Sequence, residues 1–296
     1  MPFTFLAHQA PVIPLKMLLP RWFSGAGLVI GSMAPDFEKF IGASTAGRYG
    51  HSLVGQLTFC LPLSLAAYWL ATRVVAAPLS RHLPDVGPLR LRDYPVALAE
   101  GRRPAWPKLV GSILLGSASH VAFDGFTHAD PRVVAVFPML AARSVLVGDR
   151  AVWLLPLLQV FATVVGAAVT LLLMVLIARR RRVLAWADVP LAVARSRAAG
   201  ASAAIRYWAL VGAVTLVLSG GFAVAERLAA PWKRTRTVAF WVMIRLPLSG
   251  FIALCVAGTV ARFGDGAGTG GAAPQAGRPG SPGRHRGSSP SRTRFR

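Results

Sequence analysis

Two histidines and an aspartate recur at four-residue intervals in GSASHVAFDGFTHADP, residues 116–131. His120, Asp124 and His128 would lie on one face of a helix, because residues four apart are neighbours on an α-helix. Imidazole and carboxylate groups suit a divalent transition metal such as Zn, Mn or Fe better than Ca or Mg. The spacing therefore predicts a metal site. The alternative, a hydrogen-bond network between helices, is favoured for any one of the three alone.

The N-terminal region supplies further residues of the same two types. His8 lies in MPFTFLAHQAPVIPL, Asp36 lies in LVIGSMAPDFEKF, and His51 lies in GHSLVG. Each has a simpler interpretation, as a surface histidine, a cap or turn acid and an interfacial histidine. Ser52, directly after His51, is suited to cap a following helix.

The elements that position these residues must be membrane helices. The chain has 296 residues, of which 54% are hydrophobic and 15% charged, whereas soluble proteins carry about 25% charged residues. Its mean hydropathy is +0.52. Runs of about 20 apolar residues span a bilayer as helices, and no alternation typical of membrane β-strands is present. We predict an all-α, polytopic membrane protein with about five transmembrane helices, at residues 52–72, 109–128, 152–178, 207–225 and 238–261.

The basic residues predict the orientation of these helices, because Lys and Arg are retained on the cytoplasmic side. Residues 73–108, 179–206 and 262–296 together contain 21 Lys and Arg, against 11 in residues 1–51, 129–151 and 226–237. This alternation predicts an N-terminus outside and a C-terminus in the cytoplasm. His82 then lies on the cytoplasmic side, apart from the other histidines.

The predicted topology brings the candidate ligands to one membrane boundary. The first span begins outside at His51 and the second ends outside at His128, with His120 about 12 Å deeper along the helix. A metal site can therefore draw on four histidines and two aspartates: His8, Asp36, His51, His120, Asp124 and His128. We predict that His120 and Asp124 bind one ion together with Asp36 and His51.

The chain divides into three parts. Residues 1–51 form an external or interfacial segment with candidate ligands, residues 52–262 form the transmembrane helical domain, and residues 263–296 form a disordered basic tail rich in Gly, Pro, Ser and Arg. The net charge of +22 is concentrated in loops between apolar spans, so it indicates membrane lipids as partners and not nucleic acid. The Pro- and Arg-rich residues 73–108 are interpreted as an irregular connection.

The motifs MPFTFLAHQAPVIPL, GSMAPDFE, GHSLVG and SHVAFDGFTH, in this order, resemble an uncharacterised bacterial family of multipass membrane proteins, classed as a domain of unknown function. More distantly, the series is similar to membrane-bound metal-dependent hydrolases. That similarity implies metal binding by the six residues above. We expect the protein to lie in the cytoplasmic (inner) membrane. The hydrolase pattern has a His-Arg pair before its His-Ser, where this chain has Arg48 and Tyr49, so one ligand of that pattern is missing.

Two hypotheses follow for the function. The first is a metal-binding membrane protein, with zinc as one candidate ion, that hydrolyses a lipid or phosphoester substrate. The second is a noncatalytic transporter or membrane scaffold with a buried polar network. Arg245 favours the second, because a charge inside a span needs a partner or an aqueous cavity. The substrate and the oligomeric state are not determined by the sequence.

Overall fold

The computed structural model describes residues 4–41, 49–84, 87–127, 131–138, 144–147, 150–195, 198–229 and 235–268. Within these residues, five helices are long and apolar enough to cross a membrane: Leu53–His82, Trp106–Thr127, Leu154–Arg179, Ala201–Ala229 and Thr237–Phe263. They confirm the predicted helical class and the place of each predicted span. Large apolar side chains on them are exposed, as Leu216 is at 75% and Phe161 at 65%, which suits contact with lipid tails.

The first long helix is a chain of five helical segments. These are α4 (Leu53–Gly55), the π-helical turn η3 (Gln56–Cys60), α5 (Leu61–Leu70), the π-helical turn η4 (Ala71–Val75) and α6 (Ala76–His82). Each π-helical turn comes just before a proline, Pro62 or Pro78. A proline lacks the N–H of the helical ladder and crowds the carbonyl four residues back, so the helix widens locally there.

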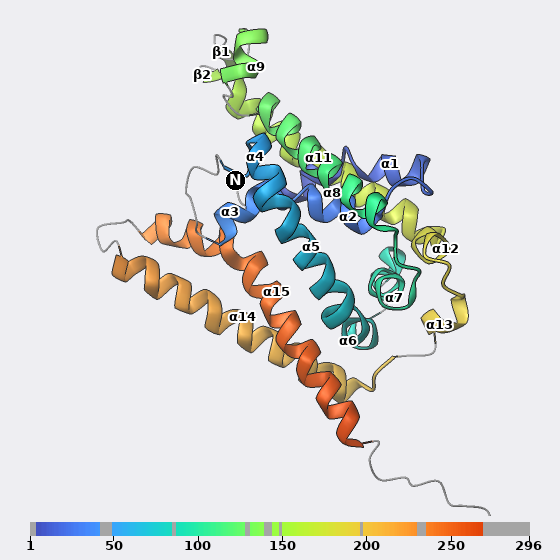
Figure 1. Cartoon of the computed structure of the whole chain (residues 1–296). Coiled ribbons are helices and arrows are strands. Elements are labelled where there is room, and N and C mark those ends of the chain that lie inside the picture. The colour runs from blue at the N-terminus through green and yellow to red at the C-terminus, as the bar shows by residue number, and fades with distance from the viewer. Residues whose placement is uncertain are drawn as a thin grey trace, which may run out of the picture.

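Helix α8 (Trp106–Thr127) packs against the N-terminal segment and against the third span, Leu154–Arg179 (Figure 1). In its most apolar stretch 39% of the residues are buried, against 11–17% in the other four long helices. A span that is covered by protein can carry polar side chains at lower cost than one that faces lipid. The predicted ligands His120 and Asp124 are therefore on the best covered helix.

The N-terminal segment is a series of short elements. These are the 3₁₀ turn η1 (Thr4–Gln9), α1 (Ile13–Leu18), α2 (Gly25–Gly31), the 3₁₀ turn η2 (Ala34–Asp36) and α3 (Phe37–Phe40). Of these elements, the two 3₁₀ turns and α2 pack against α8. A Cβ atom at Gly31 would lie 2.2 Å from the Ile113 carbonyl oxygen, and one at Gly116 would lie 2.4 Å from the Leu28 carbonyl oxygen. Small residues on both helices thus let α2 and α8 approach backbone to backbone.

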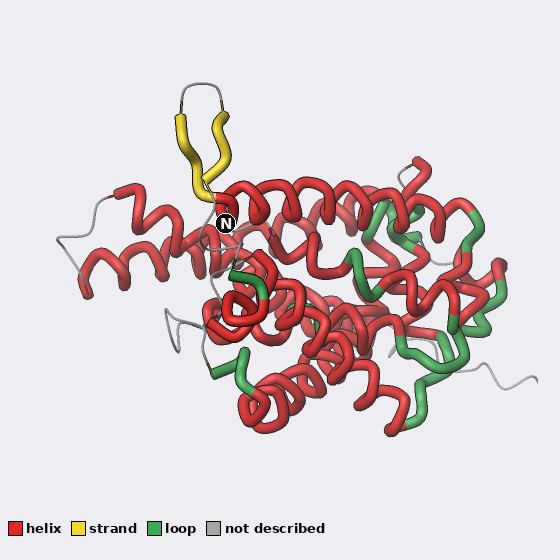
Figure 2. Tube along the Cα trace, turned by 90° about the horizontal axis from the view of Figure 1, so that it is seen from above, coloured by secondary structure: helices red, strands yellow, loops and turns green. Residues whose placement is uncertain are grey.

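The long helix α11 (Leu154–Arg179) covers η1 and follows the hairpin of β1 (Ser144–Val147) and β2 (Arg150–Trp153). The two strands are antiparallel, with Ser144 opposite Trp153, and the hairpin projects from the helical body in Figure 2. A short helix, α9 (Pro131–Val136), comes before it. This hairpin and α9 occupy the region between the second and third spans.

Helices α14 (Ala201–Ala229) and α15 (Thr235–Gly268) form a long pair beside the first span (Figure 1). Tyr207 and Val211 of α14 pack with Ala253 and Ala257 of α15, and Leu79 of α6 joins them. Helix α15 continues to Gly268, past the predicted start of the tail, and residues 269–296 lie outside the described residues.

The two basic connections meet at one end of the molecule. The predicted irregular connection contains ordered elements: α6 extends to His82, a 3₁₀ turn η5 covers Gly87–Leu89, and α7 covers Asp93–Glu100. Val96 of this α7 packs with Leu184 of α12 (Arg182–Trp186) and with Ala194 of α13 (Leu191–Arg195). Prolines alone therefore misled the sequence-based interpretation, because a small core forms between two connections that are distant in sequence.

Candidate metal centre

Four predicted ligands meet near the C-terminal end of α8. One ligand atom from each of Asp36, His51, His120 and Asp124 lies within 4.8 Å of the other three. These are the four residues that the sequence predicted to share one ion. His8 lies beside them, while His128 lies outside the described residues.

His120 is the innermost residue of the group, with a side chain that is 0% exposed. Its Nδ1 lies 2.7 Å from the carbonyl oxygen of Ser32, at the end of α2. A carbonyl oxygen only accepts, so Nδ1 carries the hydrogen and donates it. Nε2 then faces the carboxylates, 3.4 Å from Asp124 Oδ2 and 3.9 Å from Asp36 Oδ1.

Asp124 lies one helical turn after His120, and its carboxylate contacts histidines from two other elements. Its Oδ2 is 3.2 Å from His51 Nε2, and its Oδ1 is 3.4 Å from His8 Nε2. The rings of His8 and His120 stack with centroids 3.9 Å apart, and His51 meets His120 edge to face at 5.2 Å. His8 and His51, which come from two different elements, therefore meet at the carboxylate of Asp124.

The short N-terminal elements hold these side chains in place. Thr170 of α11 donates to the Leu6 carbonyl at 2.8 Å, which fixes η1 beside α8. Ser24, the N-cap of α2, donates its N–H to Ser112 Oγ at 2.8 Å. Since His120 donates to Ser32 at the other end of α2, both ends of this helix are tied to α8.

His51 is positioned by the start of the first span. The predicted helix cap is confirmed, because Ser52 Oγ accepts the Gly55 N–H at 3.0 Å. The preceding Gly50 donates its N–H to the buried Glu38 at 2.9 Å, and its carbonyl accepts the thiol of Cys60 at 3.4 Å. The backbone on both sides of His51 is thus restrained.

Asp36 is not the helix cap that its position suggests, since its side chain makes no cap hydrogen bond. It points instead toward His120 and forms an ion pair of 2.6 Å with Lys39. Burial by itself would raise the pKa of Asp36, but His120 and Lys39 outweigh burial and hold that pKa below its usual range. The carboxylate is therefore kept in the charged form that binds cations.

Three contributors were missed from the sequence. Lys39 and Glu38 lie beside Asp36 in the run PDFEK, but neither residue type at that spacing indicates a partner. The Ser32 contact is made by a backbone carbonyl, which leaves no signal in the residue type. The close approach of α2 had a signal, because Gly27 and Gly31 are four apart, as helix-packing glycines in membranes often are.

The site is closed on one side and open on the other. The side chains of His51 and Lys39 are 22% and 29% exposed, whereas that of His120 is fully covered. The buried Asp and His residues could therefore hold a metal ion, and the His51 side of the site is the side that is open to its surroundings.

No curated protein and no solved structure matches this chain. A family model does match, and it covers residues 1–262, which include all the residues of the candidate centre. The chain belongs to the family described as a domain of unknown function, DUF4184.

Proposed function

We propose that Asp36, His51, His120 and Asp124 bind one divalent transition metal ion, with His8 packed against the site. The observation that carries the proposal is the orientation of His120. With Nδ1–H donated to Ser32, its buried Nε2 faces two carboxylates, with Asp124 Oδ2 at 3.4 Å and Asp36 Oδ1 at 3.9 Å. A histidine that donates one ring nitrogen to a carbonyl and turns the other toward anionic groups has the arrangement found in metal sites.

The donor set selects the kind of ion. Two imidazoles and two carboxylates fit Zn, Mn or Fe, and the absence of thiolates from this group disfavours the softest ions. The charges also fit, because Lys39 neutralises only one of the two carboxylates. The two carboxylates (−2), Lys39 (+1) and a divalent cation (+2) would then sum to a net charge of only about +1, so no large buried charge is left.

We further propose that the site hydrolyses a lipid or phosphoester substrate. A bound divalent ion would polarise a phosphoryl or acyl oxygen and lower the pKa of a water. Lys39, on the open side, is placed to contact an anionic oxygen of the substrate. The resemblance of the motif series to membrane-bound metal-dependent hydrolases, an expectation from the sequence, is the reason for proposing this reaction class.

The surroundings suit a substrate with an apolar part. A cavity of about 290 Å³ lies between α8 and α11, lined by Phe123, Phe126, Thr127, Leu158, Phe161 and Ala162. Phe123 connects it to the site, because its ring lies 5.1 Å from the His8 ring. A lipid tail in this cavity would place its head group near the histidines.

The hydrolase proposal is tested with the full-length protein in micelles that contain glycerophospholipids or a chromogenic phosphodiester. Hydrolysis should require added Zn or Mn, stop with a chelator and resume when metal returns. His120→Ala should abolish it, whereas His82→Ala should not, because His82 lies at the far end of the Leu53–His82 helix from His51. A metal-loaded parent that cleaves neither phosphoesters nor carboxyl esters would refute the hydrolase.

The second candidate is a noncatalytic membrane protein in which the same residues form a proton-holding polar network. The short contacts between Asp124 and three histidines favour it, since a protonated His120 would satisfy both carboxylates without an ion. Arg245 no longer supports transport, because it pairs with Glu226 of α14 at 2.9 Å. Failure of Zn, Mn and Fe alike to bind would favour the network.

We place the centre at the outer face of the cytoplasmic membrane. The Lys and Arg distribution supports this orientation, and the two most basic internal connections do share one end of the structure. Single cysteines introduced at residues 90 and 190 in a cysteine-free background should resist an impermeant thiol reagent in intact cells, whereas one at residue 140 should react. Reaction at residue 90 would reverse the orientation.

A further inference from the structure

A second, larger cavity lies at the other end of α8 and does not depend on the metal centre. Its volume is about 1080 Å³, and its lining includes residues of α1, α2, α7, α8, α11 and α12. Lys108 of α8 lines it, 16 residues before Asp124, which corresponds to about 24 Å along the helix. The two sites are therefore at opposite ends of the same helix.

The described lining residues are strongly cationic. One acid, Asp188, stands against five bases: Lys16, Arg21, Arg102, Arg103 and Lys108. A concave surface lined mainly by one sign of charge attracts ligands of the opposite sign. The charge alone therefore indicates an anionic occupant.

Two of these cations are held by neutral oxygens. Lys16 Nζ donates to the carbonyls of Pro20 at 2.8 Å and Phe23 at 3.0 Å, and Lys108 Nζ donates to Arg21 at 2.8 Å and to the same Pro20 at 3.5 Å. Neither lysine forms an ion pair with a carboxylate of the described chain. Two ammonium groups thus converge on one carbonyl with their charge uncompensated.

The environment of Lys16 lowers its pKa. Burial and the neighbouring Lys108 together lower the pKa of Lys16 to about 8. The Lys16 ammonium also lies 5.2 Å from the centre of the Trp186 ring, a contact that favours its charged form but does not neutralise it. An anion bound between the two lysines would remove the repulsion.

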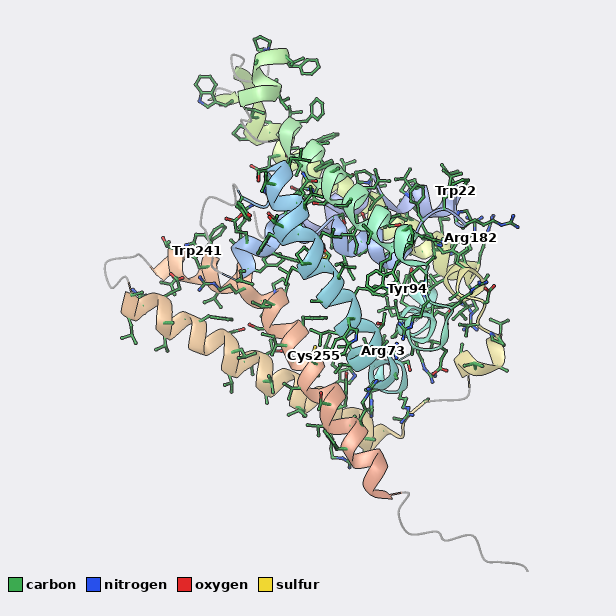
Figure 3. The ribbon with its side chains drawn as sticks, in the orientation of Figure 1. Trp22, Arg73, Tyr94, Arg182, Trp241 and Cys255 are labelled. Atoms are coloured by element: carbon green, nitrogen blue, oxygen red, sulfur yellow. The ribbon has the colours of Figure 1, made fainter. Side chains whose placement is uncertain are left out.

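The remaining walls are mostly apolar. Val29 and Ile30 of α2, Tyr68 and Ala71 of the first span, and Met174 and Ile177 of α11 line the cavity. Tyr94, labelled in Figure 3 beside this end of the helices, lines it too, and its hydroxyl reaches the Met174 carbonyl at 3.4 Å. Trp22 and Trp106 are next to lining residues in the sequence. They are 74% and 67% exposed, as is typical of tryptophans at a membrane interface.

We propose that this cavity binds the phosphate head group of an anionic membrane lipid, with Lys16 and Lys108 on the phosphate and an acyl chain along the α2, α5 and α11 walls. A soluble anion would use the bases but not the apolar walls. A zwitterionic lipid would bring its own cation into a site already crowded with cations. An anionic lipid uses both kinds of wall and carries net negative charge.

The test uses the full-length protein in phosphatidylcholine micelles with and without phosphatidylglycerol. Phosphatidylglycerol should raise Tm, and native mass spectrometry should show it retained at higher occupancy than phosphatidylcholine. Lys16→Met combined with Lys108→Met should remove most of that Tm increase and the retained lipid. Because these changes also remove internal hydrogen bonds, Arg21→Gln combined with Arg102→Gln, two exposed positions, should reduce the increase independently.

The matched control is Arg206→Gln with Arg262→Gln, an equal loss of charge at two exposed positions on α14 and α15 outside the cavity. This control should keep the full response to phosphatidylglycerol. An equal loss in the control would show a nonspecific charge effect and overturn the proposal. Equal stabilisation by inorganic phosphate in phosphatidylcholine micelles would assign the cavity to a soluble anion and overturn the lipid.

Discussion

The two ends of α8 carry opposite excesses of charge and depend on the same short helix. Near its C-terminal end, two carboxylates and several histidines converge, and the His120 ring is oriented by the Ser32 carbonyl just after α2. Near its N-terminal end, Lys16 and Lys108 converge on the Pro20 carbonyl, a few residues before α2. In both places a neutral backbone oxygen orients a side chain without cancelling the charge of the group.

A third polar grouping shows what a balanced arrangement looks like. Arg245 and Glu226 join α15 to α14 at 2.9 Å, and the Arg245 guanidinium also lies 5.4 Å from the Phe222 ring. That pair cancels its own charge within the protein. Burial of polar groups is therefore not by itself a sign of a ligand, whereas convergence of like groups is.

The largest effect is expected from Asp124→Asn, which preserves size but removes the carboxylate that three histidines contact. Loss of an outer-shell partner alone weakens metal binding about 10–100-fold, so loss of this residue should weaken it at least about 100-fold. Competition with a fluorescent chelator measures the affinity. His82→Ala should leave it unchanged, and an unchanged affinity in Asp124→Asn would place the ion elsewhere.

The balanced pair should behave in the opposite way. Arg245→Met removes the cation that Glu226 contacts in a span, and breaking a buried pair in this way costs up to about 3–5 kcal/mol. Thermal unfolding should show this loss while metal affinity stays at the parent value. Adding Glu226→Met should recover most of the stability; a metal loss in either variant would connect the pair to the centre.

The contact between α2 and α8 should matter to both ends. Gly116→Ala would place a Cβ 2.4 Å from the Leu28 carbonyl oxygen, and such overpacking costs about 1–3 kcal/mol. It should also weaken metal binding, because Ser32 would move away from His120. Gly111→Ala on the same helix is the matched control, since its Cβ would meet nothing within 4 Å. Equal losses in the two variants would show that α2 does not orient His120.

The smallest effect is a pH dependence at the cationic end. The pKa of Lys16 is lowered from 10.5 to about 8 in the folded protein, so the unfolded chain binds more protons between these values. Stability in neutral detergent should therefore rise as pH increases from about 8 to 10.5. Lys16→Met should flatten this rise relative to Arg262→Gln. The same slope in both variants would contradict the crowding of Lys16 and Lys108.

The sequence predicted the parts of this molecule that depend on regular spacing. Five apolar runs located the spans, and the four-residue spacing placed His120 and Asp124 on one helix face. The four predicted ligands, Asp36, His51, His120 and Asp124, lie together because each membrane crossing returns the chain to one of two surfaces. This alternation limits where His51 and Asp36 can lie without any knowledge of side-chain contacts.

What the sequence did not predict depends on contacts between distant segments. The small core of Val96, Leu184 and Ala194 orders connections that appeared irregular from their prolines. The partner of Arg245 lies on a different helix, so the residue suggested an aqueous path instead of an ion pair. The Ser32 carbonyl, which orients His120, is a backbone group present at every position.

The most direct test of the account is the metal content and coordination of the purified full-length protein. The protein is loaded with Zn in chelator-free buffer, dialysed and measured by elemental analysis and X-ray absorption. We predict one ion per chain, bound only by nitrogen and oxygen at about 2.0–2.2 Å, with a histidine signal that is lost together with the ion in His120→Ala. No retained ion after loading with Zn, Mn or Fe, or sulfur in the coordination shell, would contradict the proposed centre.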